Sequence, residues 1–334
     1  MPFLAKRNGD AEASGLEQST LVTGRELPWG GFVHERSTSA EKPNDGELSS
    51  SVGLLRRLCG NTECANGWAM PWRNRKRPIF EAQWGCSGRC VLGMVQAAVR
   101  RELGEGRQAT VAAPHRHRVP LGLLMLAQGW ITHPELRRAL AAQRESGIGR
   151  IGDWLIRECG IEPEQVVRGL SMQWGCPVLT TEGFAPESMA LTMPLIFVEE
   201  FGLLPLRVAA SRILYLGFAD RLDASAAFAA ERMMGFKVES GVVEGSQFEA
   251  ARGLLLACDG VEMRRQAAKD KDTMAVKITA IIEQQQPIAS RLVRLHQYYW
   301  LRLWLERGAL GKAGVLPATK EDILDYVFTI GEQR

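Results

Sequence analysis

The chain carries two copies of one sequence pattern, and this repeat limits its possible folds more than any other feature. The copies, Pro120–Gln143 and Arg150–Gln173, start 30 residues apart. Aligned without gaps, both have Gly at position 3, Ile at 12, an aliphatic residue at 17, Arg at 19, Leu at 21 and Gln at 24. An internal duplication is the simplest explanation.

Each copy predicts two helices joined at a glycine turn. Thr132 and Glu135 have the spacing of a capping box, and Pro163 suits the first turn of a helix. After Gln173 the pattern changes to short extended runs at 177–179, 203–208, 213–218 and 237–243, with helices between them and a last helix capped by Ser246 and Glu249. The prediction is an α+β fold in which a tandem helix-pair repeat precedes a small three-stranded α+β half, with a zinc-finger module and C-terminal helices.

The remaining segments complete the predicted domain organisation. Residues 1–52 show neither helical nor strand periodicity and are expected to be a disordered tail. A Cys-rich module is expected at 53–104, a linker at 105–118, the repeat domain at 119–257 and a helical region at 258–334. Within that last region, helices are predicted at 273–307 and 320–330, broken near Pro287 and Gly308. The aromatic run at 298–304 is then either a partner surface or core packing.

Composition is that of a soluble globular protein. The 334 residues are 46% hydrophobic, and 41 basic against 38 acidic side chains leave a net charge of +3. No apolar stretch approaches the roughly 20 residues of a membrane-spanning helix, and no secretory signal is visible. We therefore expect a cytoplasmic protein without membrane insertion. Because none of the five His has triad or metal-site spacing, we expect no enzyme.

Four of the seven cysteines fall within one short segment, as Cys59-x4-Cys64 and Cys86-x3-Cys90. In a chain without an export signal, clustered thiols favour metal over disulfides, and four thiolates suit structural zinc. The order resembles a treble-clef finger, with Trp68, Trp72, Phe80 and Trp84 as its small core. Reduced structural cysteines and a disulfide are the alternatives. Arg73, Arg75, Lys76 and Arg77 beside Trp72 permit nucleic-acid binding, although a docking finger or a solvated loop has the same sequence.

The tandem pattern resembles the MshEN-type domain at the amino terminus of type II secretion and type IV pilus assembly ATPases. In that family each copy reads R-L-G, then six positions, G-x-I, four positions and L-x-x-A-L-x-x-Q. The resemblance spans about residues 119–255 and includes Leu203–Leu206 and Leu216–Asp220. It implies a regulatory module that binds cyclic di-GMP and signals to a secretion or pilus-type partner. No G-x-x-x-x-G-K-[ST] loop occurs, since 308–312 lacks its spacing and its Ser or Thr, so the chain is expected to be the sensor without the motor.

The resemblance assigns ligand contacts position by position. The first copy offers Leu121, Gly122, Leu136, Leu140 and Gln143, and the second offers Arg150, Ile151, Gly152, Val166, Leu170 and Gln173. Glycine permits close backbone approach, Arg offers a planar fork, and Gln supplies an amide for base edges.

This chain departs from the family pattern at three places. In the first copy Pro120 stands where the family has Arg, so one ligand contact is missing unless Arg118 supplies it. In the second copy Cys159 stands where the family has the turn glycine, and Gly160 follows. The spacer 144–149 has six residues, one more than the family's usual five. The alternative function is therefore an adaptor that keeps the fold without the ligand. In that case the aliphatic positions are core, the glycines close turns and the two Gln are exposed helical residues.

Overall fold

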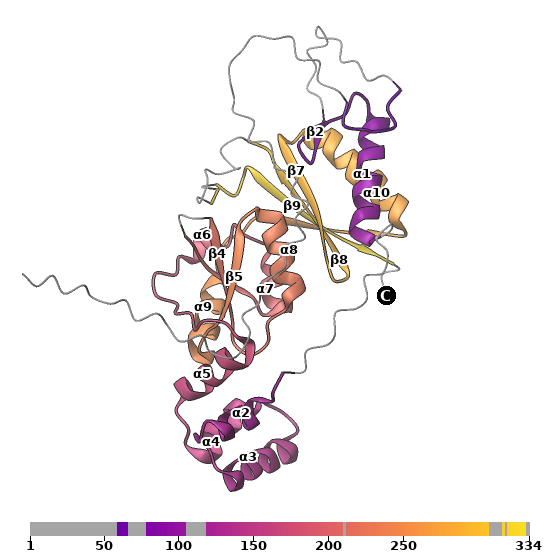
Figure 1. Ribbon diagram of the computed structural model, residues 1–334. Coiled ribbons are helices and arrows are strands. Elements are labelled where there is room, and N and C mark those ends of the chain that lie inside the picture. Colours follow the sequence, from indigo (N-terminus) through magenta and orange to yellow (C-terminus); the bar gives the residue numbers. More distant parts are fainter. Residues whose placement is uncertain are drawn as a thin grey trace, which may run out of the picture. The chain divides into compact units, whose positions relative to one another are not determined.

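The computed structural model describes residues 59–65, 78–104, 118–209, 212–306, 316–317 and 319–331 (Figure 1). The tail predicted at 1–52 and nearly all of the predicted linker lie outside these ranges. The fold is α+β, as the sequence predicted. Among the helices in these ranges, none is long and apolar enough to cross a membrane.

The duplicated segment forms two helix pairs, which confirms the repeat prediction. They are α2 (Leu121–Ala127) with α3 (His133–Ser146), and α4 (Ile151–Cys159) with α5 (Pro163–Trp174). The predicted capping box is present, because Thr132 N–H donates to Glu135 Oε2 over 2.7 Å and Glu135 N–H donates back to Thr132 Oγ1. The turn glycines Gly129 and Gly160 both have φ near +70°, at 71° and 65°. The displaced glycine of the second copy follows a longer first helix, of 9 residues against 7.

The following half contains the predicted three-stranded sheet. Its order is β3 (Leu204–Ala209), β4 (Ile213–Phe218) and β5 (Lys237–Val242), with β3 antiparallel and β5 parallel to β4. The helices are α6 (Pro186–Met189), α7 (Leu195–Phe201), α8 (Ala224–Met234) and α9 (Gly245–Leu256). Two local predictions were wrong. The segment 177–179 contributes only an isolated bridge, Val178 to Val242. The cap of α9 is Glu244, whose carboxylate accepts from Ser246 N–H and Gln247 N–H, because the helix starts two residues earlier than predicted.

The C-terminal region is mostly sheet, and the prediction of helices at 273–307 and 320–330 was wrong beyond Gln285. It contains β6 (Glu262–Ala268), α10 (Lys271–Gln285), β7 (Ala289–Leu295), β8 (Tyr298–Trp304) and β9 (Ile323–Ile330), in the sheet order β6-β9-β8-β7. Alternate β8 residues belong to two separate cores, Tyr299 to one and Trp300 to the other. A strand buried on both faces shows no polar alternation, which removes the period-2 signal of a strand. The aromatic run is therefore core packing.

The Cys-rich segment shares a core with this C-terminal sheet. Its hairpin is β1 (Ile79–Phe80) and β2 (Gln83–Trp84), followed by α1 (Gly88–Leu103). In Figure 1, α1 lies alongside α10 on one side of the sheet, and residues of both helices and of β7, β8 and β9 form one apolar cluster. Phe80 is buried in that cluster, and Trp84 is half-buried. The other two predicted core residues, Trp68 and Trp72, lie outside the described ranges.

A buried carboxylate connects three of these elements. Glu102, on α1, accepts two hydrogen bonds from Arg232 of α8, at 2.8 and 2.9 Å, and one from Arg101. It also accepts the backbone N–H of Arg294 in β7 over 3.0 Å. Burial alone raises the pKa of Glu102, but the hydrogen bonds from Arg232, Arg294 and Arg101 outweigh it and hold the pKa below its usual value.

Replacing Glu102 with Gln is expected to lower the free energy of unfolding by about 1.5–3 kcal/mol at neutral pH, because charge-assisted bonds are lost. The folded pKa is depressed, so the carboxylate's contribution is complete above the unfolded pKa of about 4.3 and disappears as pH falls through the folded value. Urea unfolding between pH 7 and pH 3 measures this. A difference in the free energy of unfolding between the wild type and Glu102→Gln that stays constant down to pH 3 would contradict the assignment.

Candidate functional site

The second motif copy lines a single pocket. Its volume is about 530 Å³, and its wall includes all six predicted second-copy residues together with Leu121 of the first copy. The second-copy residues are Arg150, Ile151, Gly152, Val166, Leu170 and Gln173. The remaining first-copy candidates, Gly122, Leu136, Leu140 and Gln143, do not line it. The candidates from the second copy thus lie together along one pocket, whereas the first copy contributes only Leu121 to its lining.

The motif glycines permit close packing within each copy. A Cβ on Gly122 would lie 2.5 Å from Cδ1 of Leu136, and one on Gly152 would lie 2.8 Å from Cγ1 of Val166. Because real Cβ atoms do not approach other atoms so closely, each glycine lets the second helix of its pair cross the first. The aliphatic residue at position 17 fills the same space in both copies, so these pairs have a structural role whatever binds nearby.

The two motif glutamines make equivalent hydrogen bonds across the repeat. Gln143 Nε2 donates to the carbonyl oxygen of Gly149 over 3.0 Å, and Gln173 Nε2 donates to that of Val119 over 2.7 Å. Gly149 and Val119 are the residues immediately before the two motif copies. The glutamine of each copy thus holds the backbone just before the first helix of the other copy. The alternative that these Gln are simply exposed is wrong, since both are half-buried and bonded.

Arg150 and Arg118 lie at the two ends of a short chain of contacts. The Arg150 guanidinium is half exposed, and its Nε is 3.6 Å from Oδ2 of Asp220. The backbone carbonyl of Asp220 accepts from the indole N–H of Trp174 over 3.0 Å, and Arg118 stacks on that indole with Cζ 3.6 Å from the ring centroid. Arg118 is therefore held on Trp174 and is not among the residues that line the pocket.

The pocket also contains carboxylates that the motifs did not identify. Asp153, Asp220, Glu244 and Glu249 line it together with Arg150. Glu244 keeps a lowered pKa despite burial, because Ser246 and Gln247 donate hydrogen bonds to it as the cap of α9. Asp220 ends the stretch 216–220 that carried the family resemblance, so the sequence held a signal for it. Glu244 had none, because the prediction assigned its capping role to Ser246.

The four clustered cysteines converge on one point. Sγ atoms of Cys59, Cys64, Cys86 and Cys90 all lie within 4.8 Å of one another. The Cys64–Cys86 and Cys86–Cys90 sulfurs are 3.5 and 3.4 Å apart, too far for a disulfide bond. Tetrahedral zinc with Zn–S bonds of about 2.3 Å requires sulfurs roughly 3.8 Å apart, so this donor set fits that ion.

The surrounding backbone builds this thiol cluster from a knuckle, a hairpin and a helix start. Cys64 N–H donates to the Asn61 carbonyl in the knuckle, and Ser87 caps α1 by accepting from Cys90 N–H. Burial and hydrogen bonds among the thiols raise the pKa of Cys86 to about 12. For Cys90 burial acts in the same direction, but hydrogen bonds led by that with Ser87 prevail and lower the pKa to about 7.

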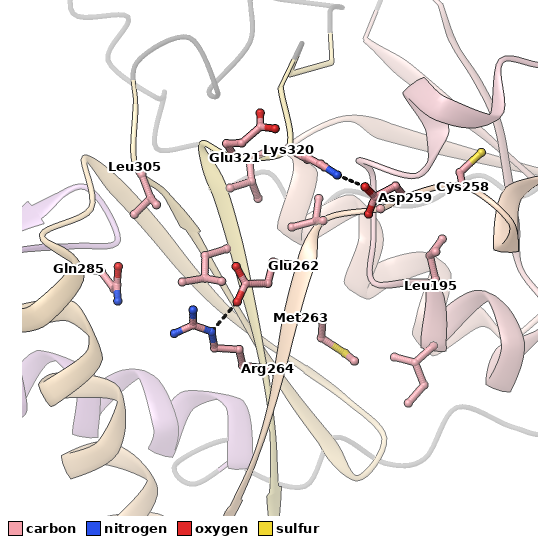
Figure 2. Close-up of a pocket in the computed structure, with 15 residues that line it drawn as sticks. Leu195, Cys258, Asp259, Glu262, Met263, Arg264, Gln285, Leu305, Lys320 and Glu321 are labelled. Atoms are coloured by element: carbon pink, nitrogen blue, oxygen red, sulfur yellow. Dashed lines mark hydrogen bonds and ion pairs between the residues drawn. The ribbon is translucent and has the colours of Figure 1, made fainter.

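A larger pocket of about 700 Å³ lies at the start of β6, and no motif predicted it. Figure 2 shows that its charged side chains face one another: Arg264 pairs with Glu262 over 2.7 Å, and Lys320 pairs with Asp259. Its cations are thus already neutralised by carboxylates within the wall.

Comparison with known proteins finds matches only among solved structures. No family model and no curated protein sequence matches the chain. MshE solved with cdg matches at 23% identity and a TM-score of 0.34, covering 41% of this chain and 97% of that one. Two crystal forms of the N-terminal domain of XpsE match at 21% identity, with TM-scores of 0.30 and 0.24, covering 40% and 46% of this chain and 92% and 100% of theirs.

Proposed function

We propose that the chain is a non-enzymatic regulatory module that binds cyclic di-GMP in the second-copy pocket and signals to a secretion or pilus-type partner. The observation that carries the proposal is the convergence of Arg150, Gly152, Leu170 and Gln173 on one pocket of nucleotide-binding size. Among them, Arg150 brings an exposed guanidinium to the wall, which packing of the helix pair alone does not require.

The positive and negative side chains of the pocket would contact different parts of the ligand. The Arg150 guanidinium, half exposed, is the group that would meet a phosphate or a guanine acceptor edge. Asp220 and Glu244, which line the same pocket, would accept hydrogen bonds from the N1–H and N2–H₂ donors of guanine. Because the first copy has Pro120 where a cation would stand, we expect the second copy to hold most of the ligand.

The second candidate is the ligand-free adaptor, and the glutamine bonds favour it. Each amide already donates one hydrogen bond, to the carbonyl of Gly149 or of Val119, which leaves only its second N–H and its Oε1 for a ligand. The pocket also has four carboxylates against one guanidinium, which disfavours a dianion near the acidic side. Binding of nucleic acid rests on residues 73–77, which lie outside the described ranges.

Calorimetric titration with cyclic di-GMP separates the two candidates. Saturable binding is expected for the wild type, with a loss of about 1.5–3 kcal/mol in affinity for Arg150→Ala, the usual value of a hydrogen bond to a charged group. Arg168→Ala is the matched control, since it is an exposed Arg on α5 that does not line the pocket. Equal affinity in both variants would exclude the second-copy site, and no heat for the wild type would favour the adaptor.

The cysteine cluster supports a proposed structural role for zinc. Cys59, Cys64, Cys86 and Cys90 would supply four thiolates, which leaves no open coordination position for catalysis. The ion would hold the knuckle against the start of α1. Its contribution is therefore expected in stability rather than in chemistry.

A further inference from the structure

A pocket at the junction of the Cys-rich segment, α8 and β7 contains three guanidinium groups. It has a volume of about 530 Å³, and Arg101, Arg232 and Arg291 line it together with the carboxylate of Glu81. It shares no residue with the motif pocket described above. Its charges are the reverse of that pocket, where carboxylates predominate.

Two of the three arginines are fully matched by carboxylates. Arg101 donates from both terminal nitrogens to Glu81, each over 2.8 Å, and from Nε to Glu102 over 2.9 Å. Arg232 donates from both terminal nitrogens to the same Glu102 carboxylate, at 2.9 and 2.8 Å. Three guanidinium groups thus share two carboxylates, and one positive charge is left over.

That surplus charge belongs to Arg291. Its Nη1 donates to the backbone carbonyls of Arg232 and, over 3.1 Å, of Met233, at the C-terminal end of α8. Within the described ranges no carboxylate forms an ion pair with it, and neither its Nε nor its Nη2 makes a hydrogen bond to the protein. Burial lowers its pKa, with the neighbouring Arg232 and Arg101 adding to the effect and Glu81 opposing it.

A fourth guanidinium, that of Arg212, also lies near Gly235, outside the lining of the pocket. A Cβ on Gly235, the residue that ends α8, would lie 3.7 Å from Nη1 of Arg291 and 3.8 Å from Nη2 of Arg212. Arg212 is exposed and makes no ion pair with any described carboxylate. The larger pocket at β6 offers a contrast, because there each lysine or arginine in the wall has a carboxylate partner. A surplus of accessible guanidinium charge, with unused donors on Arg291 in the wall of a concavity, is suited to an oxyanion.

We propose that this pocket binds the phosphate groups of a small phosphorylated molecule, with Arg291 as the principal ligand. Two oxygens of a phosphate would accept from the free Nε and Nη2 of Arg291 in the bidentate manner that guanidinium groups favour. The site is lined by residues of α1, α8 and β7, so an occupied pocket would join the Cys-rich segment to the α+β half that follows the repeat. It is independent of the cyclic di-GMP proposal.

Titration calorimetry of the full chain with sodium pyrophosphate, against sodium chloride of equal ionic strength, tests this site. Saturable binding is expected for the wild type and at least about tenfold weaker binding for Arg291→Gln, which removes the charge and the fork. Arg294→Gln is the matched control on the same strand, because its side chain contacts the His296 carbonyl and lies outside the pocket. If Arg291→Gln fails to fold, Arg291→Lys takes its place, since a single ammonium keeps the charge but not the bidentate geometry.

The outcomes separate this site from the motif pocket. Arg150→Ala is expected to retain pyrophosphate binding, and Arg291→Gln to retain any binding of cyclic di-GMP. Tighter binding of ADP than of pyrophosphate, lost in Arg291→Gln, would assign the site to a nucleoside diphosphate, and equal binding would assign it to the diphosphate group itself. Either supports the proposal. No saturable binding by the wild type, or equal affinity in Arg291→Gln, overturns it.

Discussion

Replacing Asp325 with Asn is expected to lower the free energy of unfolding by about 3–5 kcal/mol, the range for a buried ion pair that loses one charge. Asp325 and Arg302 face each other on β9 and β8, and both side chains are fully buried. Arg302 donates from Nε and Nη2 to the two carboxylate oxygens, over 2.8 and 2.7 Å. Asparagine would leave the guanidinium charge uncompensated and turn an amide N–H₂ toward its donors.

Further partners raise the cost of this substitution. The indole of Trp300 donates to the same carboxylate over 2.9 Å, and Arg302 Nη1 donates to the carbonyls of Leu191 and Thr192, each over 3.0 Å. The pair therefore connects the C-terminal sheet to the segment after α6. Equilibrium urea unfolding of the full chain measures the loss, and Glu239→Gln is the control, since it removes one partner of the exposed Lys237–Glu239 pair.

A double variant tests whether charge or packing is responsible. Arg302→Met with Asp325→Leu removes both charges, and a buried pair replaced by apolar residues is often tolerated. Here the carbonyls of Leu191 and Thr192 would lose their donor, so we expect stability between that of the wild type and that of Asp325→Asn. A double variant less stable than Asp325→Asn would show that the charge imbalance is not the main cost.

Local periodicity and capping were sufficient to predict the helix pairs from the sequence. The repeat places apolar residues on one face of each helix, and Thr132, Pro163 and the turn glycines mark the ends. The break near Pro287 was also correct, since α10 ends at Gln285. These signals depend on residues within a few positions of one another, which is why sequence alone reveals them.

The C-terminal strands were hidden by burial on both faces. In β8, Tyr299, Leu301 and Leu303 face α1 and α10, while Trp300 and Trp304 face the repeat-bearing half, and Arg302 is neutralised inside the protein. Only the tertiary arrangement supplies the second apolar face and the buried countercharge, so no local pattern distinguishes this run from a helix.

The candidate pocket was half predictable for a related reason. Arg150, Gly152 and Gln173 are named by the repeat, because a duplicated motif shows its fixed positions within the sequence itself. Asp220 and Glu244 lie 70 and 94 residues after Arg150, in the segments that follow β4 and β5. Their placement depends on strand order and helix packing, which a motif does not encode. The electrostatic character of the pocket was therefore invisible before the fold was known.

Removing metal from the cysteine cluster is the second change expected to have a large effect. If zinc is bound, apparent free energies of about 10–16 kcal/mol for structural sites exceed the roughly 5–15 kcal/mol that stabilises a typical domain. The protein purified without chelator is expected to contain about one zinc per chain by elemental analysis, and Cys86→Ser is expected to lose it. Cys258→Ser is the control, because that cysteine lies outside the cluster.

The position of α1 predicts where the consequences of metal loss stop. Val91, Val95 and Val99 are buried at 0–1% exposure in a core formed with α10 and the C-terminal sheet, which does not involve the thiols. The knuckle at 59–64 contributes no residue to this core and contacts the hairpin, as in the Gly60 N–H donated to the Trp84 carbonyl over 2.8 Å. With chelator, hydrogen exchange is therefore expected to rise sharply at residues 59–64 while Phe80 and α1, which belong to the shared core, stay protected. Loss of protection along all of α1 would show that the metal also supports the shared core, and unchanged exchange at the knuckle would show that the four cysteines hold no ion.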